Sequence, residues 1–181
     1  MKKLNRRFFR KSALEAARDI LGKYLVRITP QGKAVVKIVE AEAYMGIDDE
    51  ASHSYHGRLT ERNKVMYENG GVFYVYKIYG IYHCLNVVAG GKNIPQAVFI
   101  RSAEPVEGIE ILKKNRNMNK FNFRNLTNGP SRMAQALDIG LEFYGKSVEN
   151  NQLYFLTGEK VPEKEIISVP RVNIDYAQSA K

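Results

Sequence analysis

Two dense runs of β-branched and aromatic residues decide the fold of this chain: VFYVYKI, from Val72 to Ile78, and YHCLNVV, from Tyr82 to Val88. Residues of these types favour strands. The two runs are separated only by Tyr79-Gly80-Ile81, and a connection this short is typical of a β-hairpin. The sequence therefore predicts a hairpin with Tyr79 at its tip.

The same residue types predict further strands on both sides of the hairpin. These strands cover Tyr24–Ile28, Val35–Tyr44, Ala97–Ala103, Leu153–Leu156 and Ile166–Val169. Helices are predicted from the capping box at Ser12 to Gly22, from Glu104-Pro105 to Asn115, and after Gly129-Pro130. This order favours an α+β fold, with a strongly curved or partly closed antiparallel sheet, flanking helices and a protruding hairpin. A chain of 181 residues fits a single domain, covering residues 1–181.

The apolar pattern also orients individual elements. The first helix carries one apolar face, which we expect in the core and which consists of Leu14, Ala17, Ile20 and Leu21. Two polar segments without periodicity, Met45–Tyr67 and Lys113–Asn128, are expected to be loops. A structureless span as long as the first is usually functional.

The distribution of charge favours a polyanionic partner. The chain has 28 basic and 19 acidic side chains, a net charge of +9 and a pI near 9.6. A merely lysine-rich surface would give the same totals, but the basic residues gather at Lys2–Lys11, Arg58–Lys64 and Lys113–Arg124. This clustering supports nucleic acid as the partner, with Arg58 and Arg62 as candidate contacts to its backbone.

The remaining composition narrows the class of protein. The single cysteine, Cys84, excludes an internal disulfide and a multi-cysteine zinc site, and its apolar surroundings predict a buried thiol. No run reaches the ~20 apolar residues that span a membrane. The basic N-terminus is not followed by the apolar core of a signal peptide. We therefore expect a cytoplasmic protein, associated with the nucleoid, that has no membrane partner.

The predicted strand Val35–Tyr44 carries two acidic residues at alternate positions. Alternation places Glu40, Glu42 and Tyr44 on one face and turns Val39, Ala41 and Ala43 toward the core. Both glutamates could simply be solvated on an exposed face of the sheet. A carboxylate among aromatic rings can instead act as a general base or acid, and we expect this role for Glu42 rather than Glu40.

Tyrosines on the hairpin offer stacking surfaces. Tyr74, Tyr76 and Ile78 share one strand face, which an ordinary core stripe would also explain. A core would more easily use Phe, Val or Ile, because each buried phenol needs a hydrogen-bond partner, yet the chain has 11 tyrosines and 8 phenylalanines. Aromatic rings of this kind stack on nucleobases. An exposed Tyr79 would suit a wedge that enters a DNA groove.

A metal site is poorly supported. His53 and His56 lie three positions apart beside the acidic run Asp48–Glu50, but without helical context or a third well-spaced ligand. We expect neither a metal nor another cofactor.

Several motifs together resemble the alkyladenine (3-methyladenine) DNA glycosylase family, in the order and roughly the spacing of that family. They are Val39–Gly46, Ala51–Ser54, Gly57–Asn63, Tyr74–Asn86 and Asn128–Ser131. The similarity extends from Phe8 to about Tyr176. The chain has Glu61 where the family commonly has Pro, and it ends at Lys181, where relatives generally continue into a short segment with a Trp and an Arg-Phe pair.

The resemblance implies a role for each matching residue. Glu42 would activate the water that attacks the sugar C1′, with Arg101 near this water and the target phosphate. The flipped base would lie between Tyr44 and Tyr76, with His53 closing its pocket. The two remaining matches are Asn86, which would crowd the exocyclic amine of guanine, and Tyr79, which would enter the minor groove.

The implied activity is that of a monofunctional DNA glycosylase, which needs no cofactor and acts as a monomer on double-stranded DNA. Its substrates would be damaged purines: 3-methyladenine, 7-methylguanine, ethenoadenine and hypoxanthine. The residues alone leave two alternatives open. One is a nucleic-acid-binding protein without catalysis, and the other is a metal-dependent hydrolase that uses His53, His56 and Asp48–Glu50.

Overall fold

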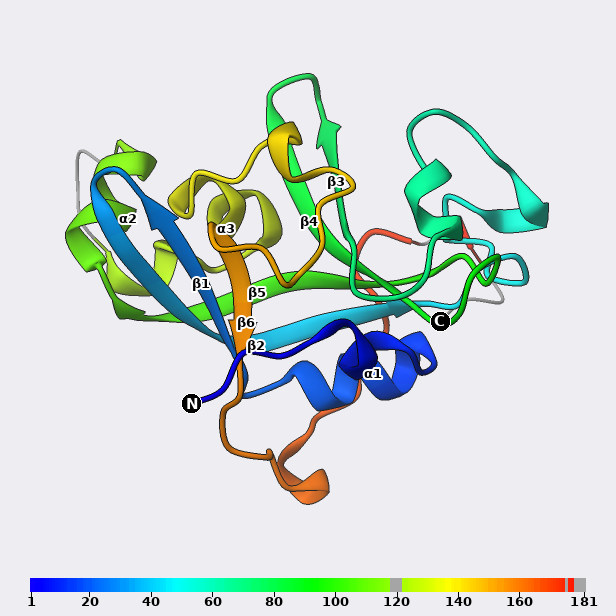
Figure 1. The fold of residues 1–181 in the computed structure, drawn as a ribbon, viewed down its shortest axis with the longest axis horizontal. Coiled ribbons are helices and arrows are strands. Elements are labelled where there is room, and N and C mark those ends of the chain that lie inside the picture. Colours follow the sequence, from blue (N-terminus) through cyan, green and yellow to red (C-terminus); the bar gives the residue numbers. More distant parts are fainter. Residues whose placement is uncertain (118–121, 175, 178–181) are drawn as a thin grey trace.

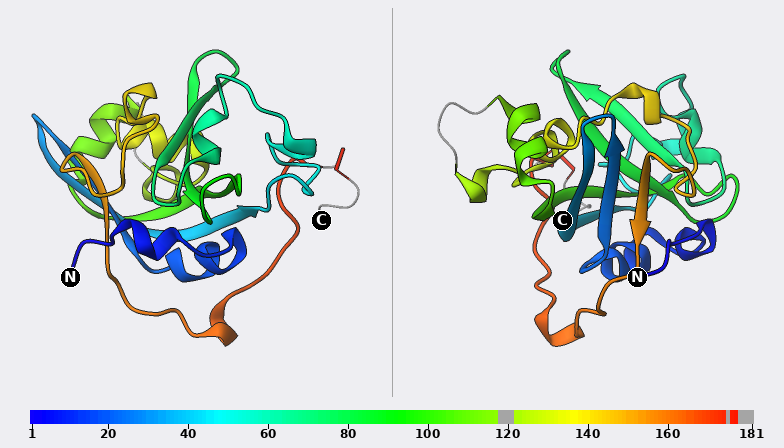
Figure 2. Two further views of the ribbon diagram at one scale, coloured as in Figure 1. Left: turned by 45° about the vertical axis from the view of Figure 1, so that its right-hand side comes forward. Right: turned by 60° about the vertical axis from the view of Figure 1, so that its left-hand side comes forward.

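The computed structural model describes residues 1–117, 122–174 and 176–177 of the chain. Its centre is a six-stranded sheet in the order β3-β4-β5-β2-β1-β6, with antiparallel pairing throughout. The strands are β1 (Tyr24–Thr29), β2 (Gly32–Tyr44), β3 (Phe73–Ile78), β4 (Tyr82–Ala89), β5 (Gln96–Glu107) and β6 (Leu153–Leu156). The sheet is strongly curved, as Figures 1 and 2 show, so the predicted α+β architecture is confirmed.

Helices pack on this sheet and short turns connect it. The α-helices are α1 (Ala13–Ile20), α2 (Ile109–Arg116) and α3 (Pro130–Ala136). Figure 1 shows α1 below β2 and α3 above β5. The 3₁₀ helices are η1 (Arg6–Phe9), η2 (Tyr55–Gly57), η3 (Lys64–Tyr67), η4 (Phe123–Asn125), η5 (Leu141–Phe143) and η6 (Glu163–Glu165). The predicted loop Met45–Tyr67 therefore contains only single 3₁₀ turns.

The first helix begins where it was predicted, but the face that it buries differs from the predicted apolar face. Ser12 and Glu15 form a complete capping box. The buried residues of α1 are Ala13, Ala16, Ala17 and Ile20, whereas Leu14 is 49 % exposed. Small alanines let the helix approach the sheet closely, so the prediction that Leu14 lies in the core is wrong.

The helix predicted from Glu104-Pro105 is also wrong at its start, because β5 continues through both residues. Glu104 pairs with Lys37 and Pro105 with Val36 of β2. The other neighbour, β4, pairs with β5 only from Gln96 to Phe99. Since β5 has no second strand beside Pro105, its missing amide hydrogen is tolerated. The helix α2 begins only after Gly108, which turns the chain with a φ of +73°.

The predicted loop Lys113–Asn128 is partly wrong. Its first residues belong to α2, and Leu126 and Thr127 are buried, with the Thr127 hydroxyl donating to the Ala103 carbonyl. The remainder includes η4, while residues 118–121 lie outside the described part of the chain.

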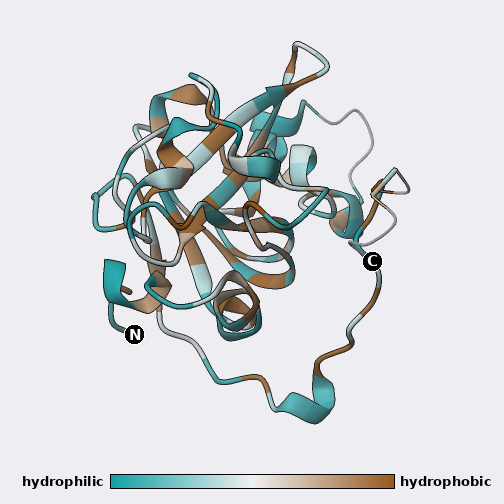
Figure 3. Ribbon diagram, turned by 90° about the vertical axis from the view of Figure 1, so that its right-hand side faces the viewer, coloured by the Kyte–Doolittle hydropathy of each residue, from teal (hydrophilic) through white to brown (hydrophobic). Residues whose placement is uncertain are grey.

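The strand predicted at Ile166–Val169 is wrong as well. These residues belong to an extended segment, residues 157–174, which we call the C-terminal strap. It leaves the sheet after β6, passes α1 and returns to the far end of β2 (Figure 2, left). The apolar part of the strap faces solvent, with Ile167 85 % and Val169 70 % exposed, and its brown segments are visible in Figure 3. Apolar alternation alone cannot make a strand where no partner strand is available.

Gly108 offers a test of how the β5–α2 junction is built. A Cβ atom there would lie 2.4 Å from the Lys33 carbonyl oxygen and 2.9 Å from the Ala34 Cα. Gly145 has a similar φ, +77°, with no heavy atom within 4 Å of its Cβ position. We expect Gly145→Ala to lower the free energy of unfolding by about 1 kcal/mol, from φ strain alone. Gly108→Ala should cost about 3 kcal/mol or more.

Urea denaturation of the two variants measures this difference. Equal losses would show that the contact with the first residues of β2 does not constrain the junction.

Candidate active site

The Glu42 carboxylate is buried, and both of its oxygens contact polar groups of other residues. Only 7 % of the residue is exposed. The Val172 amide donates to Oε1 at 3.0 Å, and Arg101 Nε lies 3.2 Å from the same oxygen. The Tyr44 hydroxyl donates to Oε2 at 2.9 Å. Two hydrogen bonds and one ion pair, from three directions, fix the orientation of this carboxylate.

A pair of bulges brings Arg101 to Glu42. Ile38 pairs with Ala103 and Glu40 with Ser102, but Ala41 already pairs with Ile100, so Val39 and Arg101 are left without partners in the ladder. Bulges re-aim side chains, and here Arg101 also bonds Glu40 at 2.9 Å. The bulge exposes 51 % of Val39, so the prediction that Val39 faces the core is wrong.

A narrow cavity of about 120 Å³ is lined by Tyr44 and Val172, the two residues that donate hydrogen bonds to this carboxylate. The predicted base-binding residues meet here, and its lining includes Tyr44, His53, Tyr76 and Asn86. Asn86 is 3 % exposed and donates through Nδ2 to the Tyr74 carbonyl at 3.2 Å. The volume is below the ~300–1,000 Å³ of most small-molecule sites, which suits a flat guest between rings.

The aromatic wall of the cavity is a connected unit. The His53 ring meets Tyr76 edge-on, with centroids 4.8 Å apart, and the Tyr74 and Tyr76 centroids are 5.1 Å apart. His53 Nδ1 is hydrogen-bonded to the Tyr74 hydroxyl at 2.7 Å. Burial raises the pKa of Tyr74 and Tyr76 above the ordinary tyrosine value, and burial with the Glu42 charge does the same for Tyr44. All three phenols therefore stay protonated near neutral pH.

The rim of the cavity carries the predicted basic residues. Arg58 and Arg62 are both exposed, and the Arg62 guanidinium lies 4.6 Å from the Tyr76 ring centroid. Asn63 is 1 % exposed and donates to the His53 and Arg58 carbonyls, which fixes the loop that holds both arginines. Arg62 thus lies over the aromatic wall, and both arginines line a neighbouring hollow that shares His53 with the cavity.

The hairpin tip is exposed, as predicted. Tyr79 and Gly80 have positive φ angles of 51° and 72°, which suit a tight hairpin turn. Tyr79 is 87 % exposed at the end of the β3–β4 hairpin, which protrudes at the top of Figure 1.

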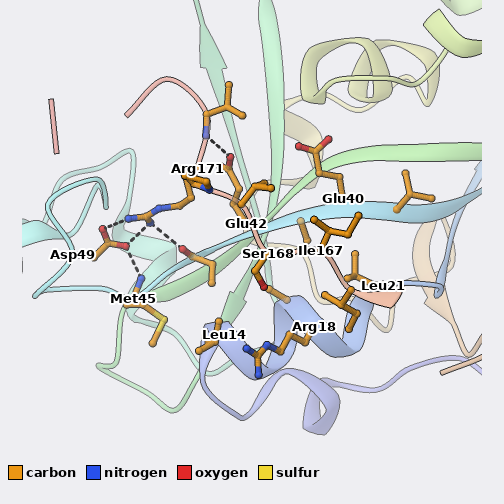
Figure 4. Close-up of a pocket in the computed structure, with 18 of the residues that line it drawn as sticks. Leu14, Arg18, Leu21, Glu40, Glu42, Met45, Asp49, Ile167, Ser168 and Arg171 are labelled. Atoms are coloured by element: carbon orange, nitrogen blue, oxygen red, sulfur yellow. Dashed lines mark hydrogen bonds and ion pairs between the residues drawn. The ribbon is translucent and has the colours of Figure 1, made fainter. Parts of the chain in front are cut away.

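The C-terminal strap completes the site. Arg171 forms a two-pronged ion pair with Asp49, donating to Oδ2 at 2.7 Å and to Oδ1 at 2.8 Å. Its guanidinium carbon is 4.7 Å from the Tyr44 ring centroid. The next residue, Val172, provides the amide that binds Glu42 (Figure 4) and also lines the cavity.

Comparison with known proteins identifies the family of this chain. A family model described as methylpurine-DNA glycosylase (MPG) matches residues 7–181. The chain belongs to this family. The resemblance seen in the motifs is thereby confirmed, and with it the assignment of the chain as a DNA glycosylase.

Curated relatives of this glycosylase are similar over nearly their whole length, each named as a candidate 3-methyladenine DNA glycosylase. One from Clostridium novyi (strain NT) is 44 % identical, covering 100 % of this chain and 92 % of its own. One from Bacillus cytotoxicus is 45 % identical, covering 96 % and 89 %. One from Clostridioides difficile (strain 630) is 40 % identical, covering 96 % and 94 %.

The sequence analysis predicted most residues of this site but did not predict that the strap takes part in it. Glu42, Tyr44, His53, Tyr76, Asn86 and Arg101 come together, as the motifs suggested. Asp49 appeared only as part of an acidic run, and Arg171 was not assigned a role. The two residues are separated by 122 positions, so no local pattern could have joined them.

Two further findings concern the other predicted classes. Over residues 1–117, 122–174 and 176–177, no three His, Cys, Asp or Glu side chains gather where they could hold a metal ion. His56 is exposed and stacks on Tyr55, with centroids 3.9 Å apart. The same part of the chain contains no helix that is long and apolar enough to cross a membrane.

Cys84 is buried as predicted, and burial raises the pKa of its thiol to about 11.

The buried imidazole of His53 gives the glycosylase a distinct pH dependence. Burial, followed by the charges of Arg62 and Arg58, lowers the pKa of His53 from 6.5 to about 4. Between these values the unfolded chain binds a proton that the folded protein does not. Stability is therefore lost as the pH falls through this window, by about 2–3 kcal/mol between pH 7 and pH 4.5.

Urea denaturation at both pH values checks this expectation. His53→Gln should lose correspondingly less stability on acidification, while the control His83→Gln on β4 should behave like the wild type. An unchanged pH dependence in His53→Gln would contradict a buried neutral imidazole.

Proposed function

We propose that this protein is a monofunctional DNA glycosylase that removes damaged purines from double-stranded DNA by hydrolysis. The substrates are alkylated and deaminated purines, namely 3-methyladenine, 7-methylguanine, ethenoadenine and hypoxanthine. The observation that carries the proposal is the Glu42 carboxylate, which is buried, paired with Arg101 and hydrogen-bonded to Tyr44 and Val172, two residues that line a narrow cavity with aromatic walls. The protein acts as a monomer on nucleoid DNA in the cytoplasm.

The hydrogen bonds of Glu42 suggest where the water binds. A carboxylate has about four acceptor positions. The Val172 amide takes one position on Oε1, which also faces the Arg101 guanidinium in an ion pair, and Tyr44 takes one on Oε2. The free position on Oε2 would accept a proton from the attacking water. The negative charge of Glu42 would also offset the oxocarbenium-like charge that develops on the sugar.

The cavity supports recognition of a flipped base through stacking. Tyr44 and Tyr76 would hold the two faces of the base, with His53 and Asn86 at its edges. Each stacking contact is worth ~1–3 kcal/mol and tolerates several bases. A cationic lesion gains further from the rings. Neutral His53 can both donate and accept hydrogen bonds, so it fits purines with different edges.

The exposed groups around the cavity support binding to duplex DNA. Tyr79 would enter the minor groove and fill the space of the extruded nucleotide. Arg58 and Arg62 on the rim would contact the backbone phosphates. Arg101, only 13 % exposed, would lie between the water and the target phosphate.

The first test replaces the proposed general base. Glu42→Gln keeps the shape of the side chain but cannot take a proton, so excision should fall by about 10²–10⁴-fold or more. Binding to duplex DNA should be nearly unchanged. The measurement is single-turnover excision from an oligonucleotide with one ethenoadenine or hypoxanthine, followed by alkali cleavage, with EDTA present.

Glu104→Gln is the matched control, since it removes the same charge from a surface pair with Lys37. Full activity of Glu42→Gln would refute the role of Glu42. A wild-type protein that binds these lesions, and methylated DNA, without excising any base would favour the non-catalytic binding protein.

A second test addresses the hairpin tip. Tyr79→Ala should slow excision from duplex DNA by roughly 10–100-fold, because the space left by the flipped nucleotide is no longer filled. Excision from single-stranded DNA should change little, since no partner strand has to be separated. Tyr79→Phe, which keeps the ring, should retain the duplex rate. Equal effects on both substrates would contradict a wedge.

A further inference from the structure

The strap enters the site without the support of the sheet. β1 pairs with β2 only as far as Lys37, so residues 39–44 have β5 on one side and the strap near the other. At its start the strap is held by Lys23, which donates to the Glu159 carbonyl at 3.0 Å. Between this point and the site, Ile167 and Val169 are largely exposed. The strap is thus anchored at its two ends.

Arg171 forms the anchor at the active site. Besides the pair with Asp49, its Nη1 donates to the Ala43 carbonyl at 2.9 Å, an acceptor on the open edge of β2. The side chain of Arg171 is 13 % exposed and that of Asp49 only 4 %. Figure 4 shows Arg171 between Asp49 and Glu42, with the strap behind it.

Asp49 is itself held rigidly. Its carboxylate accepts the Met45 amide at 2.8 Å and the Ala51 amide at 3.1 Å. Burial opposes ionisation, but the hydrogen bonds from Arg171 and from these amides outweigh it and lower the pKa of Asp49 below its ordinary value. The loop that carries His53 and the strap that carries Val172 are therefore joined by one ionised pair.

A buried ion pair is a poor source of stability, because desolvation offsets most of its attraction. Its value lies in geometry, since a forked guanidinium and a carboxylate fit in only a few orientations. Here that geometry determines the position of the following amide, which lies on Glu42 Oε1. It also fixes the cavity wall formed by Val172 and Ile174.

We propose that Arg171 is a positioning residue, whose pair with Asp49 holds the Val172 amide on Glu42 and the strap against the base cavity. This inference rests on the proposed function of the site. It assigns to the Arg171–Asp49 pair a part in the rate of base excision, separate from DNA binding. Neither Asp49 nor Arg171 lines the base cavity.

The variants for the test are Arg171→Ala, Arg171→Lys, Asp49→Asn and the double variant Asp49→Asn/Arg171→Ala. We expect the single-turnover excision rate of Arg171→Ala to fall about 10–100-fold, as for a catalytic group displaced by about 1 Å. The DNA concentration at half-maximal rate should change far less. Arg171→Lys, which keeps the charge without the fork, should recover part of the rate. The double variant should be no slower than the slower single one, because both changes remove the same interaction.

A second measurement is independent of catalysis. Hydrogen exchange of the Val172 amide, followed by NMR, should be faster in Arg171→Ala and Asp49→Asn than in the wild type, while exchange in β3–β5 stays unchanged. Lys37→Ala is the matched control, since it removes one basic charge from a surface pair on β2. It should leave both excision and exchange as they are.

Each result then decides one question. Wild-type excision rates in folded Arg171→Ala and Asp49→Asn would overturn the proposal, as would independent, additive losses in the double variant. If Arg171→Ala fails to fold, Arg171→Lys and Asp49→Asn carry the same test. If the wild type excises no base, the proposed function fails, and unchanged Val172 exchange in the variants would then overturn the anchor as well.

Discussion

The arrangement of this molecule depends on one buried carboxylate. An ionised group that is removed from water must receive donors from the protein, or burial becomes prohibitively costly. Glu42 receives hydrogen bonds from Tyr44 on its own strand and Val172 on the strap, and its charge is paired with Arg101 on β5. The bulges in the sheet bring Arg101 to this carboxylate, and the strand face that carries Glu42 also brings the Tyr44 hydroxyl. The return of the chain after β6 brings the Val172 amide.

In this site the ionised side chains and the uncharged aromatic side chains lie on different sides. The ionised groups, Glu42 with Arg101 and Asp49 with Arg171, lie on one side, where each is paired. On the other side the tyrosines and His53 stay uncharged because they are buried. Under the proposed function, a base held there would meet neutral rings, while the developing charge on the sugar would meet a carboxylate. Strong electrostatic interactions would thus be kept for the part of the substrate whose charge changes.

The sequence predicted the hairpin, most strands and the residues of the cavity, because each rests on a local pattern. Alternation in β3 and the short turn at Tyr79 required no knowledge of distant residues. Predictions failed where a distant partner decides the outcome. Pro105 lies in a strand because β2 is beside it, Val39 is exposed because of a bulge, and Ile167 is not in a strand because no strand adjoins it. The Arg171–Asp49 pair was missed for the same reason.

The paired bulges at Val39 and Arg101 also preserve the register between β2 and β5. One residue is added on β2 and one on β5, so the register before and after them agrees. A single bulge would shift the pairing beyond it by one residue. Because the two bulges offset each other, Arg101 can turn toward Glu42 while Ala41 to Tyr44 pair with β5 in line with Val36 to Ile38. The local distortion is thus confined to the bulged residues and is not passed along the strands.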